Sequence, residues 1–393
     1  MIRTCLTSSL PKRTLTPVFA IRQGPKVTQQ PRILFSTSTS LHSWSRNNHS
    51  AMSSARNNSA AWLVEAKAHP FQVKPAPMWT PEANEILVRN HALAINPVDG
   101  SLQAFAWWPL NYPTILGLDV AGEVVAVGPN VTRFKVGDRV TGCAVGMASK
   151  RNQDNGFQLY TILQTNMATP IPDSLSYEKA TVIPLGLSTA SCALFQDSHL
   201  HLQYPTSPAP KPTGKTLLVW GGASSVGSNA IQLAVAAGYE VIATASPKNF
   251  GLVKSLGATE VFDYNSPTVL EDLLAAFKAR TCAGAFDCIG AAAWKPVADL
   301  VAQSQGDKVV ATTKGGFPDP PEGVTMKPVF GTTLKDNDVG KAVYEDFLPR
   351  ALATGSFVPA PEPMVVGTGL EKIQEGVDLL KKGVSAKKVV VTL

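Results

Sequence analysis

Leu217-Leu218-Val219-Trp220-Gly221-Gly222-Ala223-Ser224-Ser225-Val226-Gly227 is the stretch that decides the fold. An apolar run typical of a buried strand leads into a turn of small residues. Apolar residues then follow at helical spacing, at Val226, Ala230, Leu233, Ala234 and Ala237. A second apolar run, Glu240 to Thr244, comes after Gly238. This order predicts a β-turn-α-β unit, whose helix N-terminus favours the pyrophosphate of a dinucleotide.

The loop departs from the full G-x-G-x-x-G pattern, because Ser224 and Ser225 stand where a second glycine is usual. A purely structural turn is therefore the alternative to cofactor binding. NAD-specific sites usually carry Asp or Glu about 20 residues further on, where the carboxylate binds the ribose 2′-OH. Here that place reads Ala243-Thr244-Ala245-Ser246-Pro247-Lys248-Asn249. Ser246 and Lys248 can bind a 2′-phosphate, so we expect NADP(H), with a solvent-exposed helix cap as the alternative role of Lys248.

The net charge gives no argument for nucleic-acid binding. Eight of the 35 Lys and Arg residues precede Glu65, the first acidic residue, which leaves 27 basic against 29 acidic residues in the remainder. That remainder is nearly neutral and lacks a strongly basic balance. Apolar runs also stay shorter than the ~18 residues that a membrane span needs. We therefore expect no nucleic-acid partner and no membrane partner.

Residues 1–58 differ in composition from the rest of the chain. They are rich in Arg, Ser and Thr, as in Ser36-Thr37-Ser38-Thr39-Ser40, and contain no acidic residue. This composition is typical of a mitochondrial transit peptide. A disordered tail is one alternative, and translation from Met52, which would give a cytoplasmic protein, is another. In each case residues 1–58 are excluded from the fold.

Two domains are predicted from the remaining sequence. Residues 59–195 contain β-branched runs bounded by Gly, Pro and Asn, which predict a small curved sheet or barrel. In residues 196–339 strands and helices alternate, which predicts a doubly wound parallel sheet of about six strands. Residues 340–393 read as helix, helix and strand, and the last strand is expected to return to the first domain. The fold class is therefore α/β.

Further sequence blocks occur in a recognisable order along the chain. They are Asn96-Pro97-Val98-Asp99, Pro113 through Gly128, Val136-Gly137-Asp138-Arg139-Val140, Asn155 to Tyr160, Leu256-Gly257-Ala258 and Gly383 to Leu393. With the nucleotide loop, these blocks make residues 60–393 similar to the medium-chain dehydrogenase/reductase superfamily. The resemblance implies a GroES-like β-barrel-type catalytic domain beside a Rossmann domain.

Zinc-dependent members of this superfamily hold a catalytic metal with Cys, His and Cys. By the resemblance these positions fall at the Asn96 segment, at Leu118 and near Leu185, and the four-cysteine structural lobe is missing. The five cysteines form no C-x-x-C pair, and we expect them to be buried apolar residues. The four histidines after residue 58 are scattered and expected at the surface: His69, His91, His199 and His201. We therefore expect no zinc and no metal-assisted alcohol oxidation.

The zinc-free subgroup, with the fungal trans-acting enoyl reductases, looks most similar. It implies NADPH-dependent reduction of the activated C=C bond of an enone or enoyl thioester. It also implies catalytic roles for Asn96 and Asp99. The implied cofactor contacts are Pro97 and Val98 beside the nicotinamide, Ser224, Ser225, Val226 and Gly227 at the pyrophosphate, Ser246, Lys248, Asn249 and Tyr264 at the 2′-phosphate and adenosine, Gly290 and Thr312 under the nicotinamide, and Val384 and Ser385 closing the site. Asp99 also fits a helix cap, and Tyr264 a packed edge of the core.

The proton donor is not evident from the sequence. Mitochondrial enoyl-thioester reductases carry a Tyr in the loop after N-P-x-D, but residues 102–110 contain no hydroxyl. Tyr112 is expected to pack, which leaves solvent as a donor. Phe105, Trp107 and Trp108 indicate an apolar small-molecule substrate, with packing in the core as their alternative role. A quinone reductase and an NADPH-binding protein without catalysis are the alternative functions, and the chain is expected to be a monomer or a homodimer.

Overall fold

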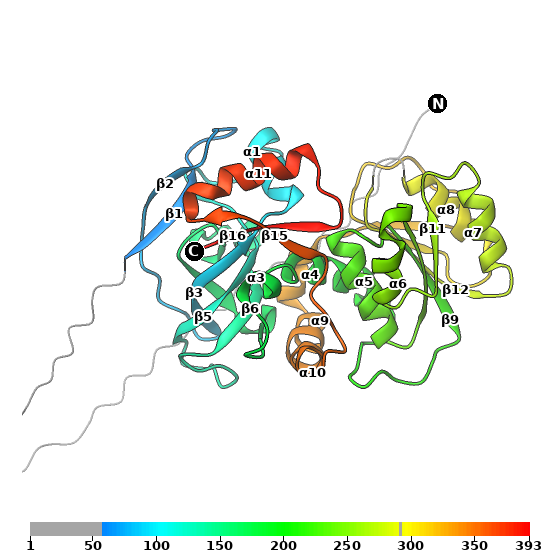
Figure 1. The fold of residues 1–393 in the computed structure, drawn as a ribbon, viewed down its shortest axis with the longest axis horizontal. Helices are drawn as coiled ribbons and strands as arrows, with labels where there is room; N and C mark the ends of the chain where they lie inside the picture. The colour runs from blue at the N-terminus through cyan, green and yellow to red at the C-terminus, as the bar shows by residue number, and fades with distance from the viewer. Residues whose placement is uncertain (1–56, 291–292) are drawn as a thin grey trace, which may run out of the picture. The chain divides into compact units, whose positions relative to one another are not determined.

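The computed structural model describes residues 57–290 and 293–393 (Figure 1). Most of the predicted transit or disordered segment therefore lies outside the described residues. The first strand, β1 (Asn58–Leu63), begins one residue before the expected start of the catalytic domain. Within the two described ranges, no helix combines the length and apolar character that crossing a membrane requires.

In the described part of the chain, one sheet contains six strands, all paired in parallel, in the order β11-β10-β9-β12-β13-β14. Its strands are β9 (Lys215–Trp220), β10 (Glu240–Ala245), β11 (Glu260–Asp263), β12 (Thr281–Asp287), β13 (Val309–Thr312) and β14 (Thr325–Pro328). The strand order reverses between β9 and β12, which is the switch point at which doubly wound sheets bind ligands. The predicted Rossmann sheet is confirmed, and β14 is one of its edges.

Alternating burial explains why these segments form a covered parallel sheet. Leu217 and Val219 belong to the apolar cluster shared with α4 (Pro184–Phe195) and α5 (Ser225–Ala236). Leu218 belongs to a second cluster, shared with helices α7 (Val269–Phe277) and α8 (Trp294–Gln303). Because both faces are covered, successive residues of the strand must all be apolar.

The described residues of the catalytic domain form two further sheets. One is three-stranded, in the order β2-β1-β4, and the other has the path β15-β16-β3-β5-β6-β8 with β7 paired to β3. These strands are β2 (Gln72–Ala76), β3 (Glu85–Ala94), β4 (Thr114–Ile115), β5 (Asp119–Val127), β6 (Arg139–Cys143), β7 (Tyr160–Gln164), β8 (Ala168–Pro170), β15 (Glu362–Thr368) and β16 (Lys387–Thr392). Strand β16 pairs antiparallel with β3, so the expected return of the last strand to this domain is confirmed.

The helical segments differ in detail from the prediction. The first of the two helices expected near the end of the chain consists of α9 (Asp338–Gly340), a π-helical stretch (Lys341–Phe347) and α10 (Leu348–Thr354). The second is a 3-10 turn (Leu370–Lys372) followed by α11 (Ile373–Lys382). Helix α11 packs beside α1 (Pro97–Phe105), as Figure 1 shows. A hydrogen bond of 2.8 Å from Gln103 Nε2 to Gln374 Oε1 joins the two helices.

Candidate functional site

The turn between β9 and α5 brings together the residues expected at the pyrophosphate. The Ser224 hydroxyl caps α5, because it accepts a hydrogen bond from the Gly227 N–H (3.0 Å) and donates one to the Gly221 carbonyl (2.8 Å). A Cβ on Gly227 would lie 2.3 Å from that carbonyl oxygen, so the close approach requires glycine. Ser225 Oγ is buried and has no hydrogen-bond partner among the described residues. The first turn of α5 is thus arranged like an anion site.

The residues expected at the 2′-phosphate gather at the carboxyl end of β10. The Asn249 side-chain amide donates to Ser246 Oγ (3.0 Å) and to Ser385 Oγ (3.4 Å). Lys248 is exposed, and no ion pair holds its ammonium group in the described part of the chain. Tyr264, 43% exposed, follows the neighbouring strand β11. A phosphate could therefore meet hydroxyl, amide and ammonium groups on one surface.

Asp287, which the sequence reasoning missed, fixes the two residues expected under the nicotinamide. Its buried carboxylate accepts hydrogen bonds from the N–H groups of Ile289 (3.0 Å) and Gly290 (2.9 Å) and from Thr312 Oγ1 (3.0 Å). A cavity of about 210 Å³ lies here, lined by Gly290, Trp294, Thr312, Lys314, Gly315, Gly316 and Phe317. The signal in the sequence is an acidic residue that ends a buried apolar strand.

Asn96 and Asp99 form the start of α1. Asn96 is the N-cap residue, and its backbone N–H donates to Asp99 Oδ2 (2.8 Å), as in a capping box. Asp99 is fully buried, and burial raises its pKa from 3.8 to about 7. The nearby Asp119 raises this pKa further, whereas Lys388 lowers it. Pro97, the first residue of the helix, is exposed, and Val98 is half-buried.

A buried polar network holds the Asn96 side chain. Its Nδ2 donates to Asp119 Oδ2 (2.8 Å), and its Oδ1 accepts a hydrogen bond from the ammonium group of Lys388. The same ammonium lies 2.7 Å from Asp119 Oδ2. The other carboxylate oxygen of Asp119 accepts from the Leu185 N–H (2.6 Å). The network joins α1, β5, β16 and the start of α4.

The three positions that hold zinc in related enzymes do not suit a metal here. Asn96, Leu118 and Leu185 come together around Asp119, yet no group of three His, Cys, Asp or Glu residues with metal-binding geometry occurs in residues 57–290 and 293–393. Carboxylate, imidazole and thiolate groups are the usual zinc ligands, and leucine offers none. This donor set does not fit zinc.

The four histidines that the structure describes also form no metal site. His69 and His201 are exposed, and His199 Nε2 lies 3.2 Å from the Pro328 carbonyl oxygen. The expectation that His91 lies at the surface was wrong. It is half-buried, and its ring stacks on Tyr177 with centroids 4.6 Å apart. Burial lowers its pKa below the ordinary value.

The loop after α1 presents aromatic side chains. Phe105 and Trp107 are 71% and 49% exposed. Trp108 stacks on Phe330, which follows β14 of the Rossmann sheet, with ring centroids 5.2 Å apart. The Tyr112 hydroxyl is buried and has no hydrogen-bond partner among the described residues. The loop therefore links the two domains through apolar contacts and offers an apolar surface.

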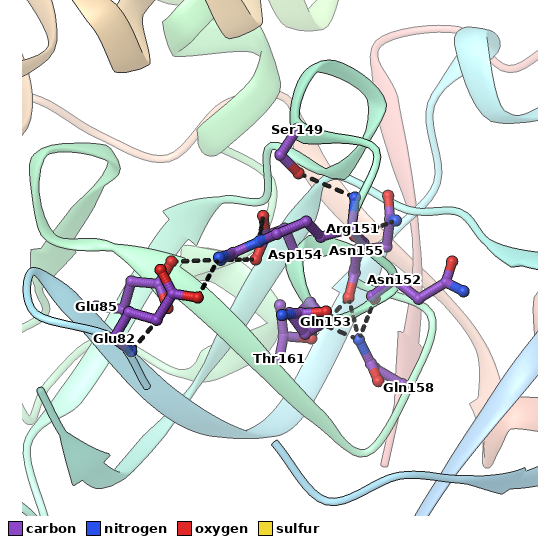
Figure 2. A network of polar contacts seen from close by, with 10 residues as sticks. All are labelled: Glu82, Glu85, Ser149, Arg151, Asn152, Gln153, Asp154, Asn155, Gln158 and Thr161. Atoms are coloured by element: carbon purple, nitrogen blue, oxygen red, sulfur yellow. Dashed lines mark hydrogen bonds and ion pairs between the residues drawn. The ribbon is translucent and has the colours of Figure 1, made fainter. Parts of the chain in front are cut away.

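A second polar network, drawn in Figure 2, holds the loop of residues 151–155 in place. Arg151 binds Asp154 through two hydrogen bonds (2.8 and 2.7 Å), Glu82 through one (2.9 Å), and Glu85. The segment continues into Phe157, whose ring would lie 2.3 Å from a Cβ on Gly117. Arg151 thus fixes a loop that packs directly against the chain entering Asp119.

Comparisons with known proteins agree with this architecture. Residues 82–173 match the alcohol dehydrogenase GroES-like domain, and residues 225–345 match the zinc-binding dehydrogenase family. A solved structure of an alcohol dehydrogenase superfamily protein from Novosphingobium aromaticivorans is 27% identical, with a TM-score of 0.69, and the match covers 86% of this chain and 99% of that one. These findings confirm the predicted α/β class, with a GroES-like and a Rossmann domain.

Curated fungal proteins are more similar in sequence. The zinc-binding alcohol dehydrogenase domain-containing protein cipB of Emericella nidulans is 64% identical over 337 residues, which cover 86% of this chain and 98% of cipB. The trans-enoyl reductase himH of Aspergillus japonicus is 42% identical over 343 residues, which cover 86% of this chain and 97% of himH. The similarity thus extends over both domains.

Proposed function

Because this chain belongs to the medium-chain dehydrogenase/reductase family of oxidoreductases, whose members bind a nicotinamide cofactor on a Rossmann domain, we propose that it uses NADPH to reduce an activated C=C bond without zinc. The substrate proposed is an apolar enone or enoyl thioester. The observation that carries this proposal is the Asn96–Asp119–Leu185 arrangement, which joins the zinc-ligand positions by hydrogen bonds and offers no set of metal ligands. The similarity to a protein named a trans-enoyl reductase supports it.

NADPH, when bound, supplies a hydride to the β-carbon, and a proton is added at the α-carbon. The chain's task is to orient both reactants and to stabilise the enolate oxygen. The first turn of α5 would bind the pyrophosphate, while Asp287 holds Gly290 and Thr312 in place under the nicotinamide. Water is the proposed proton source, because the Tyr112 hydroxyl is buried and residues 102–110 carry no hydroxyl.

The choice of NADPH rests on the group around Ser246. The end of β10 carries no carboxylate to repel a 2′-phosphate, and the exposed Lys248 ammonium supplies a compensating charge. Replacing both residues, as Ser246→Ala/Lys248→Ala, should raise the KM for NADPH about tenfold or more, from the loss of one or two charge-assisted hydrogen bonds. The KM for NADH should change little. Equal increases for both cofactors would contradict the NADPH assignment.

The reaction itself is tested by following NADPH oxidation with the protein from Met52 onward. The panel contains enoyl thioesters, enones, quinones and simple ketones, each with NADH in parallel. Turnover of enones or enoyl thioesters with NADPH is the expected result. Turnover restricted to quinones would identify a quinone reductase. A raised Tm with NADPH but no turnover would indicate a binding protein, and ketone reduction that depends on added zinc would contradict the metal-free site.

A further inference from the structure

The sequence reasoning assigned no role to Lys388, yet it is a buried lysine at the centre of the candidate site. It is 4% exposed and lies on the last strand, β16. Lysine is almost never fully buried without partners, because its charge loses the hydration of bulk water. Here the ammonium group contacts Asp119 Oδ2 (2.7 Å) and Asn96 Oδ1. Asn96 in turn donates to Asp119 Oδ2 (2.8 Å), which closes a triangle of three buried side chains.

This triangle connects to the cofactor loop through α4. Asp119 Oδ1 accepts the Leu185 N–H at 2.6 Å, which fixes the first turn of α4. A Cβ on the next residue, Gly186, would lie 2.7 Å from Asn229 Nδ2 and 2.8 Å from Ser225 Oγ, both on α5. The first turns of the two helices are therefore in direct contact. A shift at the start of α4 would move the proposed pyrophosphate loop.

We propose that Lys388 is a positioning residue, an internal cation that joins α1 and β5 directly, and α4 through Asp119, where zinc joins the corresponding segments in zinc-dependent members of the family. Its positive charge balances the negative charge of the Asp119 carboxylate, and its hydrogen bond to Oδ1 holds the Asn96 side chain in one orientation. The side chains of this site do not form a ligand set for zinc. The ammonium group is held by an ion pair with Asp119 and a hydrogen bond to Asn96. The inference takes its reaction from the proposed function, but the geometry that it assigns concerns cofactor placement and can be measured without substrate.

The test uses two variants, of which one leaves the Asp119 charge unpaired and the other removes both charges. Lys388→Met leaves Asp119 buried without a cation, so it should lower the Tm and impair catalysis together. The double variant Asp119→Asn/Lys388→Met removes both charges, so its Tm should return close to that of the wild type. If Lys388 positions the site, kcat of the double variant stays about 100-fold low, the size of effect expected from a displacement of about 1 Å.

The pH profile separates the two roles of Lys388, because a purely structural role would leave the profile unchanged. The titratable groups that interact with Lys388 are Asp99 on α1, Asp119 on β5 and Cys143 on β6. Tyr344 in the π-helical stretch interacts in turn with Asp119 and Cys143. Lys388 lowers the pKa of Asp99. In Lys388→Met the pH dependence of kcat, and of NADPH affinity measured by nucleotide fluorescence, should therefore move to higher pH. Lys388→Arg keeps the charge and should restore the wild-type profile at least in part.

Lys387 provides the matched control, since it is the adjacent lysine on the same strand but is exposed. Lys387→Met should leave Tm, kcat and NADPH affinity unchanged. A double variant with wild-type kcat, NADPH affinity and pH profile would overturn the positioning role and leave only a stabilising ion pair. If the wild type bound NADPH but turned over no panel substrate, the proposed reaction would be wrong, whereas the effect of Lys388 on NADPH affinity would still decide this inference.

Discussion

Asp99 makes the stability of the protein depend on pH in the direction opposite to that of an ordinary ion-paired carboxylate. Burial raises its pKa from 3.8 to about 7, and the hydrogen bond from the Asn96 N–H only partly offsets this. Between these two values the folded state holds a proton that the unfolded chain releases. The free energy of unfolding therefore falls as pH rises through this window. The difference between 3.8 and about 7 corresponds to about 4 kcal/mol at ~1.4 kcal/mol per pH unit.

Asp99→Asn removes this dependence and keeps an oxygen that can accept the Asn96 N–H. We expect the variant to show a flatter pH dependence, and to exceed the wild type by up to about 4 kcal/mol in unfolding free energy above pH 7. Urea unfolding at a series of pH values from about 4 to about 8, followed by tryptophan fluorescence, measures this.

Asp319→Asn is the control, because Asp319 is an exposed carboxylate on the loop after β13. It should retain the pH dependence of the wild type. If Asp99→Asn and the wild type lost stability in parallel as the pH rose, Asp99 would not be the titrating group, and the reasoning from its burial would be refuted.

Two further predictions concern the buried Arg151 network and the buried cysteines. Arg151→Met should lower the free energy of unfolding by about 3 kcal/mol, because Asp154 (1% exposed) and Glu85 lose their cation. Arg151→Lys should recover only part of this, and a loss below about 1 kcal/mol in denaturant unfolding would count against the network. Burial raises the pKa of Cys143 to about 12 and that of Cys282 to about 11. A thiol reagent at neutral pH should therefore label the protein from Met52 only after unfolding, and stoichiometric labelling of the native protein would contradict this.

The architecture of the Rossmann domain could be predicted, because its apolar patterns are local. The alternation of strands and helices predicted a parallel sheet of about six strands, and the described part of the chain has six. Strands β2 and β15 were missed. Each lies at the edge of its sheet and contains a proline, which argues against a strand because it has no backbone N–H to donate. Only pairing with a distant strand makes these segments β.

In the candidate site, too, contacts between residues close in sequence could be predicted and contacts between distant residues could not. The spacing of Asn96 and Asp99 is a capping-box pattern, and Ser224 precedes a helix as caps do, so both could be read locally. Lys388 contacts a residue 292 positions earlier in the chain. Arg151 reaches Glu82 across 69 positions. Such pairs leave no periodic signal, although a lysine preceding three valines in a strand is a hint of a buried charge.

The position of β16 has a consequence for how the chain is made. Translation delivers β3 early, but its partner β16 leaves the ribosome only after the whole β9–β14 sheet. The cofactor domain is contiguous and can fold during synthesis, whereas the other sheet keeps part of one strand edge open until β16 emerges. A ribosome that stops before residue 387 would release a chain with a finished cofactor domain and no Lys388, in which β3 keeps β5 and β7 but lacks β16 beside Ala92–Ala94. Such a product would be prone to aggregation and would lack the Asn96–Asp119–Lys388 network of the candidate site.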